Sequence, residues 1–353
     1  MSSTPLLRVR DLTVKLAGAP TPIVDHVSFT LDAGETLCLV GESGCGKSLT
    51  ALTLMGLLSS PPLMRTGGEA VFDGRDLFTL PADALRQTRG GRMAMIFQEP
   101  MTSLNPALTI GEQISEAVRA HSSASPREAR ARALQMLQRV RIPAAEKRLG
   151  DYPHQLSGGM RQRAMIAIAL ANDPRLLIAD EPTTALDVTI QAQILDLMRT
   201  LTAESGASLI MITHDLGVVA EMADKVAVMY AGRIVEAGSA AQVFDDPQHP
   251  YTIGLMRSMP ALNGARERLV TIPGRVPTPT DMPVGCRFAA RCPFATEVCD
   301  QPPEPIDISL GHRVACWHAP LEGQTPERAP ERAPGHAPGQ TPATVAEPEA
   351  RQA

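Results

Sequence analysis

The chain has 353 residues, of which 44% are hydrophobic and 3% aromatic, and its net charge is −5. This length suits one large domain with an appendage, and aliphatic side chains must build most of its core. The acidic balance excludes binding to nucleic acid through a broad basic face. No apolar run approaches the ~18 residues that cross a bilayer, and the N-terminus lacks an apolar signal segment. We therefore expect a protein that is made and kept in the cytosol.

Four short apolar runs are typical of strands buried on both faces, because they lack the alternation of a half-exposed strand. They are TLCLVG, MAMIFQ, LLIADE and LIMITH, which end at Gly41, Gln98, Glu181 and His214. In open α/β sheets, ligands bind beyond the carboxyl ends of the parallel strands. Each run ends in a group that can contact phosphate, metal or water, so together they predict an α/β fold with a nucleotide site.

The stretch GESGCGKS, residues 41–48, fits the pattern G-x-x-x-x-G-K-[ST] between an apolar strand and a helical run. Its glycines let the backbone wrap around an oxyanion, and the backbone N–H groups and the helix N-terminus point at the phosphates. Lys47 is expected to reach the β- and γ-phosphates, and the Ser48 hydroxyl to ligate Mg²⁺. The residues expected to bind ATP are Gly41, Glu42, Ser43, Gly44, Cys45, Gly46, Lys47, Ser48, Leu49 and Gln98.

A helical insert is expected over about residues 88–160. Within it, Ser125 and Glu128 have the spacing of a helix capping box. At its end, LSGGMRQR places Ser157 and two glycines at the start of a helical run, which makes a second anion site. One triphosphate does not need two such sites, so the pattern points to a site shared by two chains.

The LLIADE run supplies two adjacent carboxylates at a strand end. Asp180 suits Mg²⁺ binding through water, and Glu181 suits a general base that orients or deprotonates the attacking water. Further on, KVAVMYAGRIVEAG is expected to form a hairpin that turns at Ala231 and Gly232.

Proline becomes frequent past about residue 245, and the chain then gathers four cysteines in the pattern C-x5-C-x6-C-x16-C. A cytosolic location argues against disulfides. The short C-x2–4-C pairs usual for zinc are absent, and the spacing is not the commonest ferredoxin run, yet four thiolates satisfy a [4Fe–4S] cluster. Zinc and reduced thiols are the alternatives. From residue 320 onward the chain is rich in Pro, Ala, Glu and Gln and is expected to be disordered.

These motifs, in this order, resemble those of an ABC-transporter ATPase subunit over about residues 6–245. The resemblance implies a P-loop NTPase core of RecA type, with an antiparallel β subdomain and a helical subdomain. It makes residues 41–48 the Walker A motif, and Gln98 the Q-loop that joins Ser48 and Asp180 as Mg²⁺ ligands. Walker B then ends at Asp180, with Glu181 as the catalytic carboxylate and His214 as the switch histidine.

The resemblance also accounts for the second anion site. In the family, two such domains close head-to-tail around two ATPs, so that the signature motif of one chain faces the Walker A motif of the other. The D-loop would span residues 185–187 and include Asp187. The residues implied to bind the partner's ATP are Ser157, Gly158, Gly159 and Gln162.

A narrower resemblance is to the oligopeptide and dipeptide importer branch, through FQEPMTSLNP, YPHQLSGGMRQR, HPYTIGLMRSMP and IPGRVPTPTDMPVGCRFAARCPF. It implies a peripheral ATPase at the cytoplasmic face of the bacterial inner membrane, without a nucleic-acid partner. The implied partners are a second ATPase (a related chain or the same one), two membrane permeases and an extracytoplasmic peptide-binding protein. Some members of this branch carry an iron–sulfur cluster in the corresponding region, here at Cys286, Cys292, Cys299 and Cys316.

The expected organisation is an ABC domain over 1–245, a cysteine-containing extension over 246–319 and a tail over 320–353. Other cargoes, such as a metal chelate or a glutathione-like solute, share these motifs. A soluble ABC ATPase of translation or DNA repair is disfavoured by the single ATPase domain and the lack of coiled-coil arms. A regulatory module that barely hydrolyses is disfavoured by the intact Glu181 and His214.

One feature departs from the family. Its members usually stack adenine on an aromatic residue before the first core strand, and here no aromatic residue precedes Phe29. Leu16 takes that place by rough alignment, with Pro22 and Ile23 as other candidates. An aliphatic contact still buries the base but loses π stacking, which predicts weaker adenine binding or poorer selectivity over GTP.

Overall fold

The computed structural model describes residues 4–184, 186–258 and 272–321. Its centre is an eight-stranded sheet with the strand order β11-β12-β10-β9-β3-β8-β7-β6. Five neighbouring strands of this sheet run parallel. They are β9 (Lys225–Tyr230), β3 (Thr36–Val40), β8 (Ser208–Thr213), β7 (Leu176–Asp180) and β6 (Met93–Ile96). The four apolar runs of the sequence are thus buried parallel strands whose carboxyl ends share one edge, as predicted.

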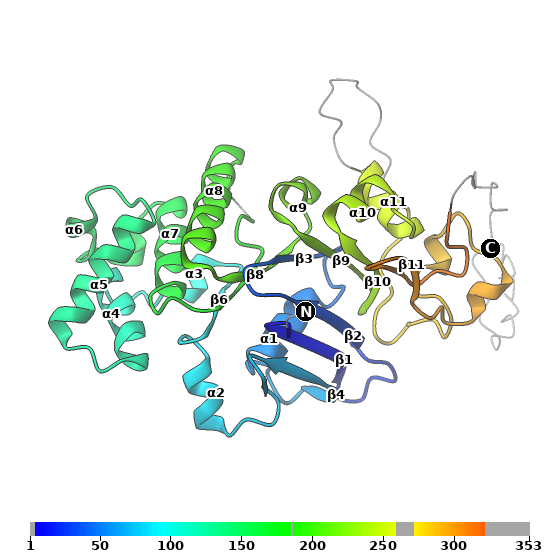
Figure 1. Cartoon of the computed structure of the whole chain (residues 1–353), viewed down its shortest axis with the longest axis horizontal. Coiled ribbons are helices and arrows are strands. Elements are labelled where there is room, and N and C mark those ends of the chain that lie inside the picture. Colours follow the sequence, from blue (N-terminus) through cyan, green and yellow to red (C-terminus); the bar gives the residue numbers. More distant parts are fainter. Residues whose placement is uncertain (1–3, 185, 259–271, 322–353) are drawn as a thin grey trace, which may run out of the picture.

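A second, antiparallel sheet packs against this core (Figure 1). Its strand order is β2-β1-β4-β5, and its strands are β1 (Leu7–Leu16), β2 (Val24–Leu31), β4 (Leu63–Phe72) and β5 (Arg75–Asp76). One apolar cluster joins the two sheets and the helix α1 (Lys47–Leu54). It includes Leu12 of the antiparallel sheet, Ala51 of α1 and Ile210 of the core sheet. Helix α2 (Ala82–Thr88) follows the second sheet. This antiparallel layer is the β subdomain that the family resemblance implies.

The helices after β6 form an arm at one end of the molecule (Figure 1). They are α3 (Pro100–Ser103), α4 (Ile110–His121), α5 (Pro126–Arg139), α6 (Ala145–Arg148), the 3-10 turn η1 (Pro153–Gln155) and α7 (Gly158–Ala169). Helix α5 begins with the predicted capping box, in which Ser125 accepts a hydrogen bond from the Glu128 N–H. The arm differs at both ends from the helical insert expected over residues 88–160. At the first end, β6 pairs with β7 and belongs to the core sheet, and at the second end, α7 extends past residue 160.

Two further helices follow the strands β7 and β8. They are α8 (Val188–Ser205) and α9 (Leu216–Met222), and both contribute to the larger apolar cluster together with the arm. Within the residues that the structure describes, no helix has the length and apolar character needed to cross a membrane.

The C-terminal extension is joined to the core sheet. The predicted hairpin turns at Ala231 and Gly232, which both have positive φ, and leads into β10 (Arg233–Ser239). The extension then returns to pair its last strand with β10, at Glu236 opposite Val314. Its elements are α10 (Ala240–Asp245), α11 (Pro250–Arg257), the 3-10 turns η2 (Ala289–Arg291) and η3 (Glu297–Asp300), β11 (Ile306–Ser309) and β12 (His312–Val314). Residues 322–353 of the tail expected to be disordered lie outside the described ranges.

A buried carboxylate on β10 fastens the extension in place. Glu236 is 0% exposed and accepts hydrogen bonds from the backbone N–H groups of Gln248 (2.7 Å) and His249 (2.9 Å). The Nε2 of the buried His312 lies 2.9 Å from the same carboxylate. A buried carboxylate is costly unless it is fully hydrogen-bonded, and here three groups from the extension provide those bonds.

We therefore expect Glu236→Ala to destabilise the protein by about 3 kcal/mol, since two buried N–H groups and an imidazole lose their shared acceptor. Urea unfolding measures the loss, and limited proteolysis tests whether the extension opens first. Glu221→Ala, which removes an exposed partner of Arg199, is the control and should change stability by less than about 1 kcal/mol. Equal stability of the two variants would show that Glu236 does not anchor the extension.

Candidate functional site

The loop between β3 and α1 can be built only with glycine at its first position. Gly41 has a φ of 154°, and a Cβ atom there would lie 2.1 Å from the carbonyl oxygen of Met229. Gly46, the residue before α1, has a φ of 101° and would bring a Cβ atom within 3.2 Å of the Ile23 carbonyl oxygen. The loop therefore has the close-wrapped backbone that a phosphate-binding loop requires, and it leads directly into a helix N-terminus.

The ammonium group of Lys47 lies inside this loop. Lys47 is 4% exposed, and its Nζ donates hydrogen bonds to the carbonyl oxygens of Gly41 (2.6 Å) and Glu42 (3.0 Å). Cys45 is buried beside it, and burial raises the pKa of its thiol. The loop thus holds one positive charge at the position where the sequence predicts contact with phosphate.

Two oxygen ligands suited to Mg²⁺ lie together beside the loop. The Ser48 hydroxyl donates a hydrogen bond of 2.9 Å to Asp180 at the end of β7. Burial raises the pKa of Asp180, and the nearby Glu181 carboxylate adds to this effect. A bound divalent cation would favour the ionised form of Asp180, so the hydroxyl and carboxylate fit a hard cation.

Glu181 is held by side chains from three different strand ends. Its Oε2 accepts hydrogen bonds from Gln98 Nε2 (3.1 Å) and from the Thr184 hydroxyl (2.8 Å). Its Oε1 lies 3.3 Å from His214 Nδ1. Glu181 itself has a φ of 45°, a backbone conformation that few residues with a side chain adopt. The structure thus gathers Gln98, Asp180, Glu181 and His214 at one edge of the sheet.

The second predicted anion site falls at the N-terminus of α7. Ser157 caps this helix by accepting a hydrogen bond from the Met160 N–H, and a Cβ atom on Gly158 would meet open space. A Cβ atom on Gly159 would lie 3.0 Å from Ile190 of α8. The first two residues therefore border open space, while Gly159 packs against α8.

The remaining two residues expected at a shared site are placed differently. Asp187 caps α8, where its Oδ1 accepts a hydrogen bond of 2.9 Å from the Ile190 N–H. Gln162 is 2% exposed, and within the described part of the chain its Nε2 has no hydrogen-bond partner. Ala185 of the expected D-loop lies outside the described residues.

One of the three candidates for contact with adenine, Ile23, lies beside the loop. Leu16 ends β1 and is half-buried, and Pro22 is half-buried as well. Ile23 is the closest to the loop, since its carbonyl oxygen faces both Gly46 and Gly232. None of the three is aromatic.

Three contacts of this site were not foreseen from the sequence. Thr184 donates to Glu181 from only three residues away, a spacing that could have identified it. The Tyr251 hydroxyl accepts a hydrogen bond of 2.8 Å from the Glu42 N–H, and Arg291 forms an ion pair of 3.1 Å with the Glu42 carboxylate. Both partners lie more than 200 residues from Glu42, and no sequence pattern connects them with it.

All six cysteines lie in the described ranges, and none of them forms a disulfide there. Burial, together with a smaller effect of neighbouring thiols that include Cys286 and Cys299, raises the pKa of Cys292 to about 12 and that of Cys316 to about 11. The Cys292 and Cys316 sulfurs each accept a backbone N–H at 3.4 Å, from Phe294 and His318.

These contacts place the four cysteines of the extension in one neighbourhood with N–H donors directed at sulfur, which suits thiolate ligands. In the described residues, however, no three His, Cys, Asp or Glu side chains are close enough together to hold a metal ion. The donor types therefore fit a cluster, but the described side chains do not form a metal-binding group.

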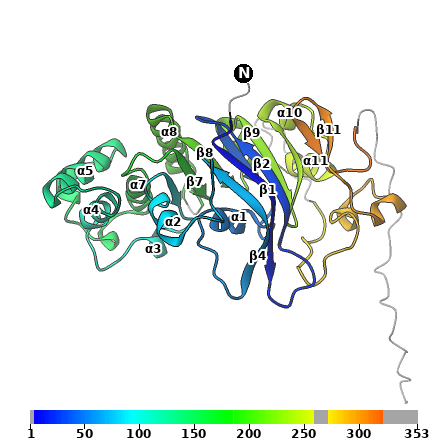
Figure 2. The same ribbon diagram turned by 60° about the horizontal axis from the view of Figure 1, so that its bottom comes forward.

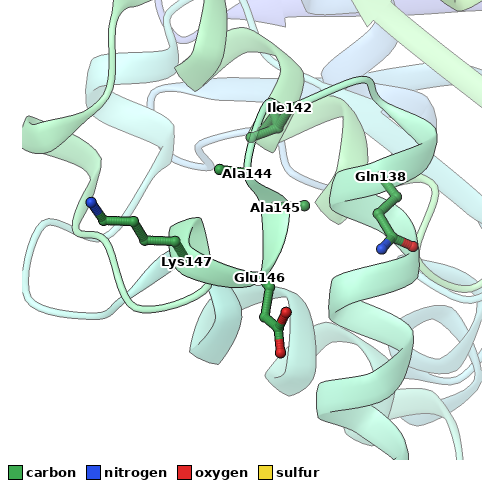
Figure 3. Close-up of a pocket in the computed structure, with 6 residues that line it drawn as sticks. All are labelled: Gln138, Ile142, Ala144, Ala145, Glu146 and Lys147. Atoms are coloured by element: carbon green, nitrogen blue, oxygen red, sulfur yellow. The ribbon is translucent and has the colours of Figure 1, made fainter.

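A separate hollow lies on the helical arm and is unrelated to these groups (Figure 3). It is lined by Gln138, Ile142, Ala144, Ala145, Glu146 and Lys147. None of the residues expected from the sequence to bind nucleotide or metal lines it, and it carries one acidic and one basic side chain.

Comparison with known families gives two matches along the chain. Residues 24–184 match the family described as ABC transporter. Residues 235–299 match the family described as Oligopeptide/dipeptide transporter, C-terminal region. The second match contains three of the four cysteines of the extension.

Individual relatives cover nearly the whole chain. A putative peptide import ATP-binding protein of Brucella abortus is 52% identical over 318 residues, which are 90% of this chain and 96% of the relative. The oligopeptide transport ATP-binding protein OppD of Haemophilus influenzae is 51% identical over 315 residues, which are 89% of this chain and 97% of the relative.

Solved structures of ATP-binding cassettes resemble about two thirds of the chain. The dimeric ATP-binding cassette MJ0796, in a post-hydrolysis state with ADP and Pi, aligns with a TM-score of 0.59 at 28% identity, over 66% of this chain and 98% of that one. CbiO1 of Clostridium perfringens, part of the ABC transporter complex CbiONQ, aligns with a TM-score of 0.59 at 27% identity, over 69% of this chain and 92% of that one.

Proposed function

The chain belongs to the ABC transporter ATPase family, and we propose that it is the ATP-hydrolysing subunit that energises the import of oligopeptides or dipeptides. Relatives that are half identical over nine-tenths of the chain are named for peptide import, which supports this cargo class. The observation that carries the enzymatic proposal is the placement of Glu181, held by Gln98, Thr184 and His214 beside the Walker A loop.

In this proposal the Walker A loop binds the triphosphate of ATP. Its backbone N–H groups and the N-terminus of α1 hold the phosphate oxygens. Lys47 would give up its two bonds to loop carbonyls and turn to the β- and γ-phosphates. Ser48, Asp180 and Gln98 would hold Mg²⁺, which neutralises phosphate charge when it is bound.

Glu181 then acts on the attacking water. A carboxylate at the end of β7 accepts a proton from water as the water attacks the γ-phosphate. The hydrogen bonds from Gln98 and Thr184 fix the direction of this carboxylate, and His214 lies against its other oxygen. Gln98 thereby connects the general base with the start of the helical arm, because it lies between β6 and α3.

A second ATPase subunit would complete the site. Ser157 and Gly158 border open space at the N-terminus of α7, which suits contact with the γ-phosphate held by another chain. The dimeric form of the cassette MJ0796 gives a precedent for such pairing. Gln162 is buried, so it would contact the partner's ATP only after a local rearrangement of α7.

Membrane permeases are the partners that an ABC importer ATPase requires. Phe97 and Met101 flank Gln98 and are 37% and 64% exposed. Exposed apolar side chains next to a residue that contacts the general base suit a docking site whose position responds to nucleotide. We place the subunit at the cytoplasmic face of the inner membrane, below two permeases fed by an extracytoplasmic peptide-binding protein.

The four cysteines of the extension are proposed to hold one [4Fe–4S] cluster. Neighbouring thiols and backbone N–H donors at Cys292 and Cys316 support this proposal, although the sulfurs would have to approach one another. Burial raises the pKa values of Cys286, Cys292 and Cys316, so these thiols would carry protons unless a metal displaced them. The cluster would stabilise the extension or sense redox state.

Glu181→Gln should keep ATP binding and lower the rate of phosphate release at least about 100-fold, because an amide cannot accept the proton of water. Phosphate release under saturating ATP and binding of a fluorescent ATP analogue measure the two effects separately. Glu221→Gln, an exposed substitution outside the site, is the matched control and should leave both values unchanged. Near-normal turnover in Glu181→Gln would mean that another group is the base.

Ser157→Arg should stop turnover at the Walker A site of the opposite chain, because it places bulk and charge at the N-terminus of α7. Mixed dimers isolated with two tags separate this from an effect within one chain. With Ser157→Arg in one chain and Lys47→Ala in the other, one site stays complete and about half of the activity should remain. With both changes in the same chain, both sites are damaged and activity should disappear. The reverse result would contradict head-to-tail pairing.

Anaerobic purification should give a brown protein that absorbs at about 400 nm and contains about four irons per chain. Cys292→Ser should lose the colour, whereas the control Cys38→Ser should keep it, because Cys38 is buried in the core strand β3. A colourless anaerobic preparation, with stoichiometric zinc or with no metal, would refute the cluster.

A further inference from the structure

The Walker A loop carries a carboxylate that is paired with an arginine of the extension. The two terminal nitrogens of Arg291 each contact a different oxygen of Glu42, at 3.1 Å in both cases. This is a bidentate pair, the strongest geometry available to a guanidinium and a carboxylate. The Arg291 side chain is 6% exposed and that of Glu42 is 30% exposed. Solvent therefore reaches the pair mainly at Glu42, and it screens the attraction less than it would for a fully exposed pair.

Contacts other than the pair with Glu42 also hold the Arg291 side chain in place. Its Nε donates to the carbonyl oxygen of Pro273 at 2.8 Å, and one terminal nitrogen donates to that of Ile272 at 3.3 Å. Its guanidinium lies 5.7 Å from the ring centre of Tyr230 and 5.9 Å from that of Phe288. An arginine whose remaining donors and faces are already occupied has little freedom, so it holds Glu42 in one position.

Other contacts from the same region fix the rest of the loop. The Tyr251 hydroxyl accepts the Glu42 N–H, and the Gly232 N–H donates to the Cys45 carbonyl oxygen at 2.9 Å. Arg287 donates to the carbonyl oxygen of Ala231 and pairs with the buried Asp25. The turn at 285–292 therefore reaches the loop directly through Arg291 and indirectly through the turn at 231–232. Figure 2 shows the extension lying beside the antiparallel sheet, next to the core.

We propose that Arg291 is a positioning residue of the nucleotide site, which neutralises and orients Glu42 so that the Walker A loop accepts a nucleoside triphosphate. The inference rests on the proposed function, since it assumes that this loop binds ATP. An unpaired Glu42 would bring a negative charge close to a ligand with about four negative charges, and the two would repel each other. Arg291 removes that repulsion and also keeps the Glu42 carbonyl oxygen, a partner of Lys47, in its place.

The test is a double-mutant cycle on the full chain, read as the Kd for a fluorescent ATP analogue. Arg291→Ala should weaken binding about tenfold, because it leaves the Glu42 charge unpaired. Glu42→Gln provides the second single variant of the cycle, and the double variant should recover most of the affinity lost in Arg291→Ala. The loss in Arg291→Ala should shrink at high salt, which a general defect in folding would not cause.

Two controls keep the outcomes separate. Arg313→Ala removes an exposed ion pair with Asp307 elsewhere in the extension and should leave Kd unchanged. Lys47→Ala in the same assay shows whether the loop binds ATP at all, so a wild-type protein that binds no better than this variant refutes the proposed function, not merely the role of Arg291.

If Arg291→Ala unfolds, Arg291→Lys takes its place in the cycle. Lysine keeps the positive charge but cannot contact both carboxylate oxygens as the guanidinium does, so Arg291→Lys should weaken ATP binding about threefold. Adding Glu42→Gln to this variant should again restore the affinity. Unchanged ATP affinity in a folded Arg291 variant, or a loss that Glu42→Gln does not restore, would overturn the inference.

Discussion

The parallel register of β6, β7, β8 and β3 is the constraint on which the site depends. It brings Gln98, Glu181, His214 and the Walker A loop, which are separated by up to 173 residues, to one edge of a single sheet. All four strands are fully or almost fully buried, and their alternate side chains belong to two apolar clusters on opposite faces of the sheet. A slip by one residue would exchange the side chains of the two faces and disrupt the packing of both clusters. The precision of the catalytic edge is thus a consequence of hydrophobic packing.

Gathering these groups places like charges together. Glu42, Asp180 and Glu181 surround the place where a polyanion must bind, an arrangement that would be repulsive without compensation. Each carboxylate has its own partner: Arg291 for Glu42, Ser48 for Asp180, and His214 with two neutral donors for Glu181. Lys47 points its charge into the loop. Each acid of the site therefore has a hydrogen-bond or ion-pair partner of its own.

Much of this could be predicted from sequence because it depends on local patterns. The glycine spacing of residues 41–48, the unbroken apolar runs and the capping box at Ser125 each encode structure within a few residues, and the structure bears them out. The pairing of β12 with β10 and the contact of Arg291 with Glu42 depend on how distant segments pack, and neither has a local signal. The burial of Gln162 is of the same kind, since it follows from how α7 faces the core. The bounds of the helical insert, expected over about 88–160, overlap the apolar run MAMIFQ that the sequence also predicts as a strand, and the structure places that run in the core sheet as β6.

The pairing of β12 with β10 also determines the order in which the chain can mature on the ribosome. Until residue 314 has emerged, β10 is a sheet edge with unpaired backbone groups, and Glu236 is a carboxylate without the imidazole that contacts it later. Exposed sheet edges invite pairing with other chains. A nascent chain that stalls in the extension would therefore be a target for chaperones although every nucleotide motif has already been translated. The core sheet is therefore completed by β12 only after every nucleotide motif has been translated.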